Sequence, residues 1–172
     1  MDDLNAINFA LLMMRVCVGL SLAMHGKNHI WGGGKIPGTG RWFSSIGMKH
    51  GELNAWLASV TEIVAGVGLA LGLMTTLDAA GFVGCLFVAV WTVHRFNGFF
   101  IIKEGWEYVT VLMVVSVGIA MIGPGQWSLD HALGIDDKLD GWVALIIGAG
   151  GGLLAAGTTL ALFYTKPVKT ES

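Results

Sequence analysis

The chain has 172 residues, of which 54% are hydrophobic and 13% are charged. Soluble domains carry about 25% charged residues, so this composition excludes a soluble fold and indicates an integral membrane protein. The net charge is -2, and the few basic residues do not cluster with aromatic side chains on a soluble face, which excludes a nucleic-acid-binding protein.

Five apolar segments each approach the ~20 residues that a helix needs to cross a bilayer. They cover residues 6–24, 53–73, 79–97, 108–122 and 142–164. We therefore expect an all-α, polytopic membrane helical bundle. Residues 1–140 form a four-helix transmembrane domain with an interfacial loop at 27–51, and residues 141–172 form a fifth transmembrane helix and a tail.

The distribution of Lys and Arg predicts the orientation of the bundle. Basic residues concentrate in the first loop, in the loop before residue 108 and in the C-terminal tail, whereas the opposite side carries only Lys138. Basic loops face the cytoplasm. We expect a multi-pass protein of the cell inner (plasma) membrane, surrounded by membrane lipids, with its N-terminus outside and its C-terminus in the cytoplasm.

Two ionisable residues lie at similar predicted depth inside the first two spans. Arg15 is about ten residues from the outer end of its span, and Glu62 is about eleven from the outer end of the next. A charge inside a membrane needs a partner or a function. We predict a structural ion pair between Arg15 and Glu62, with a functional proton relay as the alternative.

The loop after the first span contains a short amphipathic segment. Trp42, Phe43 and Ile46 fall on one side of a short helix, with Arg41 and Ser44 on others. We expect this helix to lie in the membrane interface. It either roofs the neighbouring polar cluster or serves as a simple anchor.

A polar cluster is expected where three helix ends meet on the cytoplasmic side. Its members can donate hydrogen bonds or accept protons, as the two carbonyl oxygens of a quinone require. The candidate ligand-binding residues are His25, Lys27, His94, Glu107 and Tyr108, with Glu107 and His25 as candidates for catalysis. The alternative is a solvated rim of helix ends.

Other cofactors are weighed against the same residues. His25 and His94 could supply two axial ligands to a haem, and His25, His29 and Glu107 include zinc-ligand types, but their spacing forms no tight motif. We favour neither, and expect no metal and no covalently bound cofactor. The sequence also contains no flavin, iron–sulfur or dinucleotide motif, so electrons would have to come from a partner.

The fifth span is rich in glycine and free of ionisable groups. Gly148 and Gly152 are four residues apart, a spacing that lets two helix backbones approach closely. We expect them to be helix-docking residues. The contact lies either within the monomer or with a partner or a second copy of the chain.

Several short motifs together resemble one family of membrane proteins. They are His25-Gly26-Lys27, residues 38–47 (GTGRWFSSIG), residues 62–66 (EIVAG), residues 71–75 (LGLMT), residues 105–108 (GWEY) and residues 123–130 (GPGQWSLD). In this order and spacing, across residues 10 to 131, the chain resembles the DoxX family, and the fifth span is an addition to that family's four-helix core.

The resemblance implies an association with quinone-linked redox chemistry and with the response to oxidative stress. It implies an integral membrane subunit of a redox complex that binds quinone or a similar lipid-soluble ligand in the cytoplasmic-side cavity. Such an oxidoreductase subunit would need another membrane or membrane-associated redox protein as its electron donor. The alternative is a non-catalytic scaffold or accessory subunit that stabilises or recruits a membrane protein partner.

Overall fold

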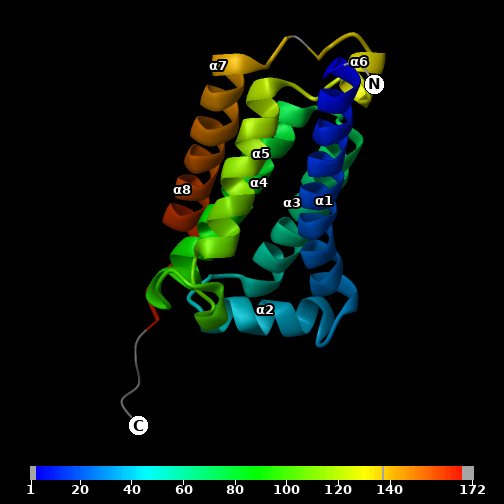
Figure 1. The fold of residues 1–172 in the computed structure, drawn as a ribbon. Coiled ribbons are helices and arrows are strands. Elements are labelled where there is room, and N and C mark those ends of the chain that lie inside the picture. The colour runs from blue at the N-terminus through cyan, green and yellow to red at the C-terminus, as the bar shows by residue number, and fades with distance from the viewer. Residues whose placement is uncertain (1–2, 137, 168–172) are drawn as a thin grey trace.

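The computed structural model describes residues 3–136 and 138–167, and this part of the chain is helical and contains no strand (Figure 1). This architecture confirms the all-α prediction. The helices are α1 (Asp3–Trp31), α2 (Lys35–Ser45), α3 (Gly51–Leu71), α4 (Thr75–Thr92), η1 (His94–Phe96), η2 (Ile101–Lys103), α5 (Glu107–Ile122), α6 (Leu129–Ala132), α7 (Gly141–Ala144), η3 (Leu145–Gly151) and α8 (Gly152–Phe163).

Four helical segments in the described part of the chain are long and apolar enough to cross a membrane. They are α1, α3, α4 and the continuous rod Gly141–Phe163, which combines α7, the π-helical η3 and α8. α5 is also apolar, but its 16 residues rise only about 24 Å at ~1.5 Å per residue. The chain is a multi-pass membrane protein, and the side that each terminus faces stays a prediction.

The two ends of the bundle are covered differently (Figure 1). α2 lies across the end at which α8 finishes. At the other end, near the N-terminus, the loop that carries α6 passes over the tops of the helices. The long helices run between these two covers.

Small residues bring α1 and α3 into direct backbone contact. A Cβ placed on Gly19 would lie 2.4 Å from the carbonyl oxygen of Gly66, and a Cβ on Gly26 would lie 2.6 Å from that of Ser59. Without a hydrophobic driving force in lipid, such close van der Waals packing holds membrane helices together. The contacts also fix the register, because Gly26 of α1 faces Glu62 of α3.

The fifth helix is part of the bundle. A Cβ on Gly152 would lie 2.6 Å from the Cβ of Val83, and one on Gly148 would lie 3.4 Å from the Cβ of Ala79, so both glycines face α4. Both glycines therefore dock the fifth helix on α4 within the chain, which is one of the alternatives expected for them. Docking of a partner or a second copy stays a prediction.

The end of α8 is clamped to the loop that follows α2. Lys49 N–H donates to the Phe163 carbonyl at 2.7 Å, and Thr165 N–H donates to the Gly47 carbonyl at 2.8 Å. Between these two hydrogen bonds, Met48 and Tyr164 form an isolated antiparallel β-bridge. The clamp places α8, α2 and the start of α3 at one end of the bundle.

Candidate functional site

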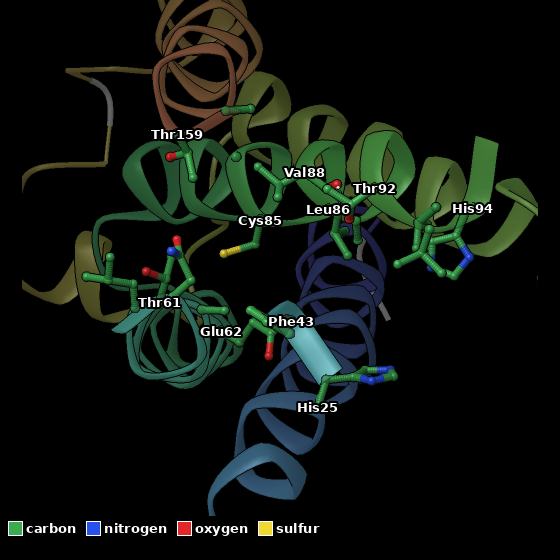
Figure 2. A pocket seen from close by; sticks show the side chains of 18 of the residues that line it. His25, Phe43, Thr61, Glu62, Cys85, Leu86, Val88, Thr92, His94 and Thr159 are labelled. Carbon is green, nitrogen blue, oxygen red and sulfur yellow. Dashed lines mark hydrogen bonds between the residues drawn. The ribbon is translucent and has the colours of Figure 1, made fainter. Parts of the chain in front are cut away.

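A cavity of about 520 Å³ lies beneath α2, inside this end of the bundle. α1, α2, α3, α4, α5 and α8 all contribute to its walls. Figure 2 shows Glu62 of α3, Cys85 of α4 and Phe43 of α2 around a common space. The volume falls within the ~300–1,000 Å³ of typical small-molecule sites.

The cavity reaches the lipid-facing surface between α3 and α8. Both helices pack on α4, but they do not pack extensively on each other. The α4 residues between them are small, and Gly81 and Gly84 belong to the cavity wall. Leu57 of α3 and Ala155 of α8 are exposed and also line the cavity. A lipid-soluble molecule could therefore enter sideways from the bilayer.

α2 forms the roof of the cavity, as one of the two sequence interpretations predicted. Trp42, Phe43 and Ile46 all line it. The helix is tied down by a hydrogen bond from the Thr39 hydroxyl to the carbonyl of His29, at 3.2 Å. The apolar face of α2 thus points into the protein at this position.

Three of the five predicted ligand-binding residues line the cavity: His25, His94 and Tyr108. The rings of His25 and Tyr108 approach with centroids 6.4 Å apart, across the gap between α1 and α5. Both side chains are exposed, so they form a polar mouth and not a sealed chamber.

His94 is oriented by the backbone of the following loop. Its Nδ1 lies 2.6 Å from the carbonyl oxygen of Glu104. A carbonyl oxygen only accepts hydrogen bonds, so Nδ1 carries the proton. Nε2 is then the ring atom left to accept a hydrogen bond.

Lys27 and Glu107 do not belong to the cavity wall, which corrects their predicted role. Lys27 is exposed and lies two residues beyond His25 on a continuous helix, about 200° around its axis. The Glu107 carboxylate accepts a hydrogen bond from Ile101 N–H at 3.0 Å and so holds the η2 turn against the start of α5. Both residues lie near the end of the bundle at which the cavity was predicted, but their side chains do not line it.

The predicted ion pair between Arg15 and Glu62 is wrong. The Glu62 carboxyl group faces the imidazole of His29, whose Nδ1 lies 3.4 Å from Glu62 Oε2. α1 and α3 are staggered, so the residue opposite Glu62 is Gly26, about three turns further along α1 than Arg15. Glu62 instead lines the cavity.

Arg15 lies toward the opposite end, and its side chain is fully buried. Its guanidinium donates to the Trp127 carbonyl at 2.6 Å and to the Ala70 carbonyl at 3.4 Å. Gly72 ends α3 with φ of 65°, and a Cβ there would lie 2.1 Å from Arg15 Nη1. The residue after α3 must therefore be small for Arg15 to fit.

Sequence reasoning missed the deeper polar residues of the cavity. The sequence assigns His29 only to a possible zinc site and Glu62 to a pair with Arg15, and it gives Cys85 no role in the predicted site. All three line the cavity. The four-residue spacing of His25 and His29 on one helix was the available signal, because such residues share a face. Among residues 3–136 and 138–167, no three His, Cys, Asp or Glu side chains group in a way that could hold a metal ion.

A family model named DoxX matches residues 10–95, which is half of the chain. The chain belongs to the DoxX family. The match begins inside α1, covers α2 to α4 and extends into η1, so it includes His25, His29, Glu62 and Cys85. Searches of curated proteins and of solved structures return no match.

Two motifs of the DoxX resemblance fall beyond the matched residues. The segment 105–108 contains Glu107 and Tyr108 at the start of α5, and the segment 123–130 ends in Asp130. Asp130 caps the start of α4, because its carboxylate accepts hydrogen bonds from Met74 N–H at 2.6 Å and from Thr75 N–H at 3.0 Å. The last residue of this motif therefore has a structural role, which is to cap α4.

Proposed function

We propose that this DoxX-family protein is a membrane subunit of a redox complex and that it binds a quinone or a similar lipid-soluble ligand in the cavity beneath α2. The observation that carries the proposal is the cavity itself. It has mostly apolar walls, polar side chains grouped in part of it, and an edge at the lipid-facing surface.

The arrangement of the lining residues fits a molecule with a polar ring and an apolar tail. His25 and Tyr108 offer an imidazole and a phenol at the mouth that can donate to a quinone carbonyl, and His94 Nε2 can accept a hydrogen bond from a quinol hydroxyl. The wall between α3 and α8 consists of apolar and small residues such as Leu57 and Gly84, which suits a hydrocarbon tail. A tail in this gap would continue into the bilayer.

Interconversion of quinone and quinol moves two electrons and two protons. The chain's contribution would be to bind the ring, to orient it and to exchange protons at its oxygens through the ionisable side chains of the cavity. A partner protein that carries a redox cofactor would exchange the electrons. A role in oxidative stress would follow from the partner's chemistry.

The basic loops support a cytoplasmic position for the cavity. Lys35, Arg41 and Lys49 lie in or beside α2, and Arg95 and Lys103 belong to the η1 and η2 turns near the same end. A cysteine introduced at the exposed Ser45, in a protein whose Cys17 and Cys85 are replaced by Ala, tests this orientation. It should react with a membrane-impermeant thiol reagent only when the reagent reaches the cytoplasmic face.

Ligand binding can be tested with decylubiquinone added to the purified protein in detergent micelles. Quinones quench tryptophan fluorescence, and Trp42 lines the cavity, so saturable quenching that is reduced in Trp42→Phe is expected. Gly84→Leu should weaken binding, because a Cβ at Gly84 meets only ordinary contacts beyond 3.5 Å and the longer side chain would extend into the cavity.

Gly157→Leu is the matched control. Gly157 lies on α8 and a Cβ there meets nothing within 4 Å, so this variant adds the same side chain to a lipid-facing position. It should bind like the parent protein. Linear, non-saturable quenching that is equal in the parent and in Gly84→Leu would reject the proposal and favour the accessory-subunit alternative.

A further inference from the structure

Two polar groups of the cavity, a carboxyl and an imidazole, face each other without a hydrogen bond. Glu62 is 9% exposed, and its Oε2 lies 3.4 Å from Nδ1 of His29. Both atoms are buried, and neither has a hydrogen-bond partner. Buried polar atoms in proteins nearly always have one, so these two atoms indicate that a third polar group belongs beside them.

The pair is held in place from outside the cavity. The His29 ring packs edge-on against Phe43 of the α2 roof, with centroids 5.9 Å apart. Glu62 is fixed by the close contact of α3 with Gly26 of α1, where a Cβ would lie 3.0 Å from the Glu62 Cβ. Neither side chain needs to move to receive a ligand, because both already line the cavity.

We propose that Glu62 and His29 together bind a ring hydroxyl group of the ligand, so that the site prefers the reduced quinol to the oxidised quinone. This inference rests on the proposed function and names the form of the ligand. A hydroxyl donates one hydrogen bond and accepts others, so it satisfies both atoms when the pair holds a single proton. A carbonyl only accepts, so it satisfies both atoms only when both carry a proton.

The position of the pair defines how the ligand lies. With one hydroxyl between Glu62 and His29, the ring lies below Phe43 and beside Cys85, which lines the same space (Figure 2). The tail then follows the small residues of α4 toward the gap between α3 and α8. The residues that border this path are mostly apolar or small, such as Leu57, Gly84 and Ala155, and Thr61 and Thr159 add two hydroxyl groups.

The test compares two probes that differ only in their hydroxyl hydrogens. Decylubiquinol, kept reduced under argon, and its bis(methyl ether) are titrated against the purified full-length protein by equilibrium dialysis. Hydrogen bonds to charged groups are the stronger class, so Glu62→Met should weaken binding of the quinol about tenfold or more. The same substitution should change the affinity for the methyl ether less than about twofold, because the ether has no hydroxyl group that could donate a hydrogen bond to Glu62.

Two further variants make the result specific. Glu52→Met removes a carboxylate from the exposed start of the same helix, outside the cavity, and should leave the affinities for both probes unchanged. His29→Phe should lower the preference for the quinol in the same direction as Glu62→Met. If Glu62→Met does not fold, Glu62→Gln takes its place and should lower that preference to a smaller extent, because the amide oxygen still accepts.

The outcomes separate this inference from the proposed function. If neither probe binds the parent protein, the proposed function fails. If both bind and the substitutions at Glu62 and His29 weaken the two probes equally or not at all, the hydroxyl-binding role is overturned while the cavity stays a ligand site. A selective loss of quinol binding supports both.

Discussion

The guanidinium of Arg15 donates a hydrogen bond to the backbone carbonyl of Trp127 across 2.6 Å, and so ties α1 to the loop that follows α5. Asp130 in the same loop binds the start of α4. One loop thus joins three helices at the end of the bundle opposite the cavity. The helices are fastened at this end, whereas α3 and α8 are separated along the cavity at the other.

Replacing Arg15 by Met is expected to destabilise the protein by about 1–3 kcal/mol, the cost of a buried polar group left without its partner. The substitution keeps an apolar stem but leaves the carbonyls of Trp127 and Ala70 without their donor. Thermal unfolding in detergent micelles, followed by circular dichroism, measures the loss. Arg15→Lys keeps the charge and should cost less. An unchanged midpoint in Arg15→Met would show that these bonds contribute nothing.

Replacing Asp130 by Ala should also destabilise the bundle, by about 1–3 kcal/mol. The carboxylate accepts hydrogen bonds from Met74 N–H, from Thr75 N–H and from the Thr75 hydroxyl, and it is 5% exposed. Asp140→Ala is the matched control, because Asp140 precedes α7 without a side-chain capping bond. Equal effects of the two substitutions on the unfolding midpoint would count against a capping role for Asp130.

Leucine at Gly152 should separate α8 from α4. A Cβ there already lies within 2.7 Å of the Ala80 carbonyl oxygen, so the larger side chain cannot fit without moving the helix. Overpacking typically costs about 1–3 kcal/mol. Gly157→Leu adds the same group to an open position and should be neutral. If the isolated protein lost stability in neither variant, Gly152 would be better explained as a site for an external partner.

The long helices could be predicted from sequence because the bilayer imposes both their length and their composition. The end of α1 could not, since the helix continues to Trp31 instead of stopping at residue 24. Counting depth from the outer ends of the two spans placed Arg15 opposite Glu62, but α1 is shifted along α3 so that Arg15 lies beside Ala70, near the end of α3. Apolarity defines which residues enter the membrane, but the stagger between two helices depends on which glycines meet.

The sequence predicts at which end of the bundle the candidate site lies, but it does not predict which residues line the cavity. His94 and Tyr108 line the wall because the end of α4 and the start of α5 meet there, and His25 lines it from within α1, which continues to Trp31. The Glu107 carboxylate instead accepts a hydrogen bond from the N–H of Ile101, six residues earlier. That contact depends on the local geometry of the loop, which the sequence does not reveal. The cavity itself arises because small side chains on α4 leave the space between α3 and α8 unfilled. A glycine in the sequence does not reveal whether it closes a contact or leaves a space.

Acid should loosen the loop around α6 through Asp136. A hydrogen bond with His131 lowers the pKa of the Asp136 carboxyl below its ordinary value of 3.8. The folded loop therefore favours the ionised form, so this contribution is fully present above pH ~4 and is lost as the pH falls through the lowered pKa. A carbon-13 NMR titration of the Asp136 carboxyl in micelles measures the midpoint. His131→Phe removes the partner and should raise the midpoint toward 3.8. An identical midpoint in the variant would show that His131 does not hold the carboxylate, and the acid sensitivity of the loop would then need another cause.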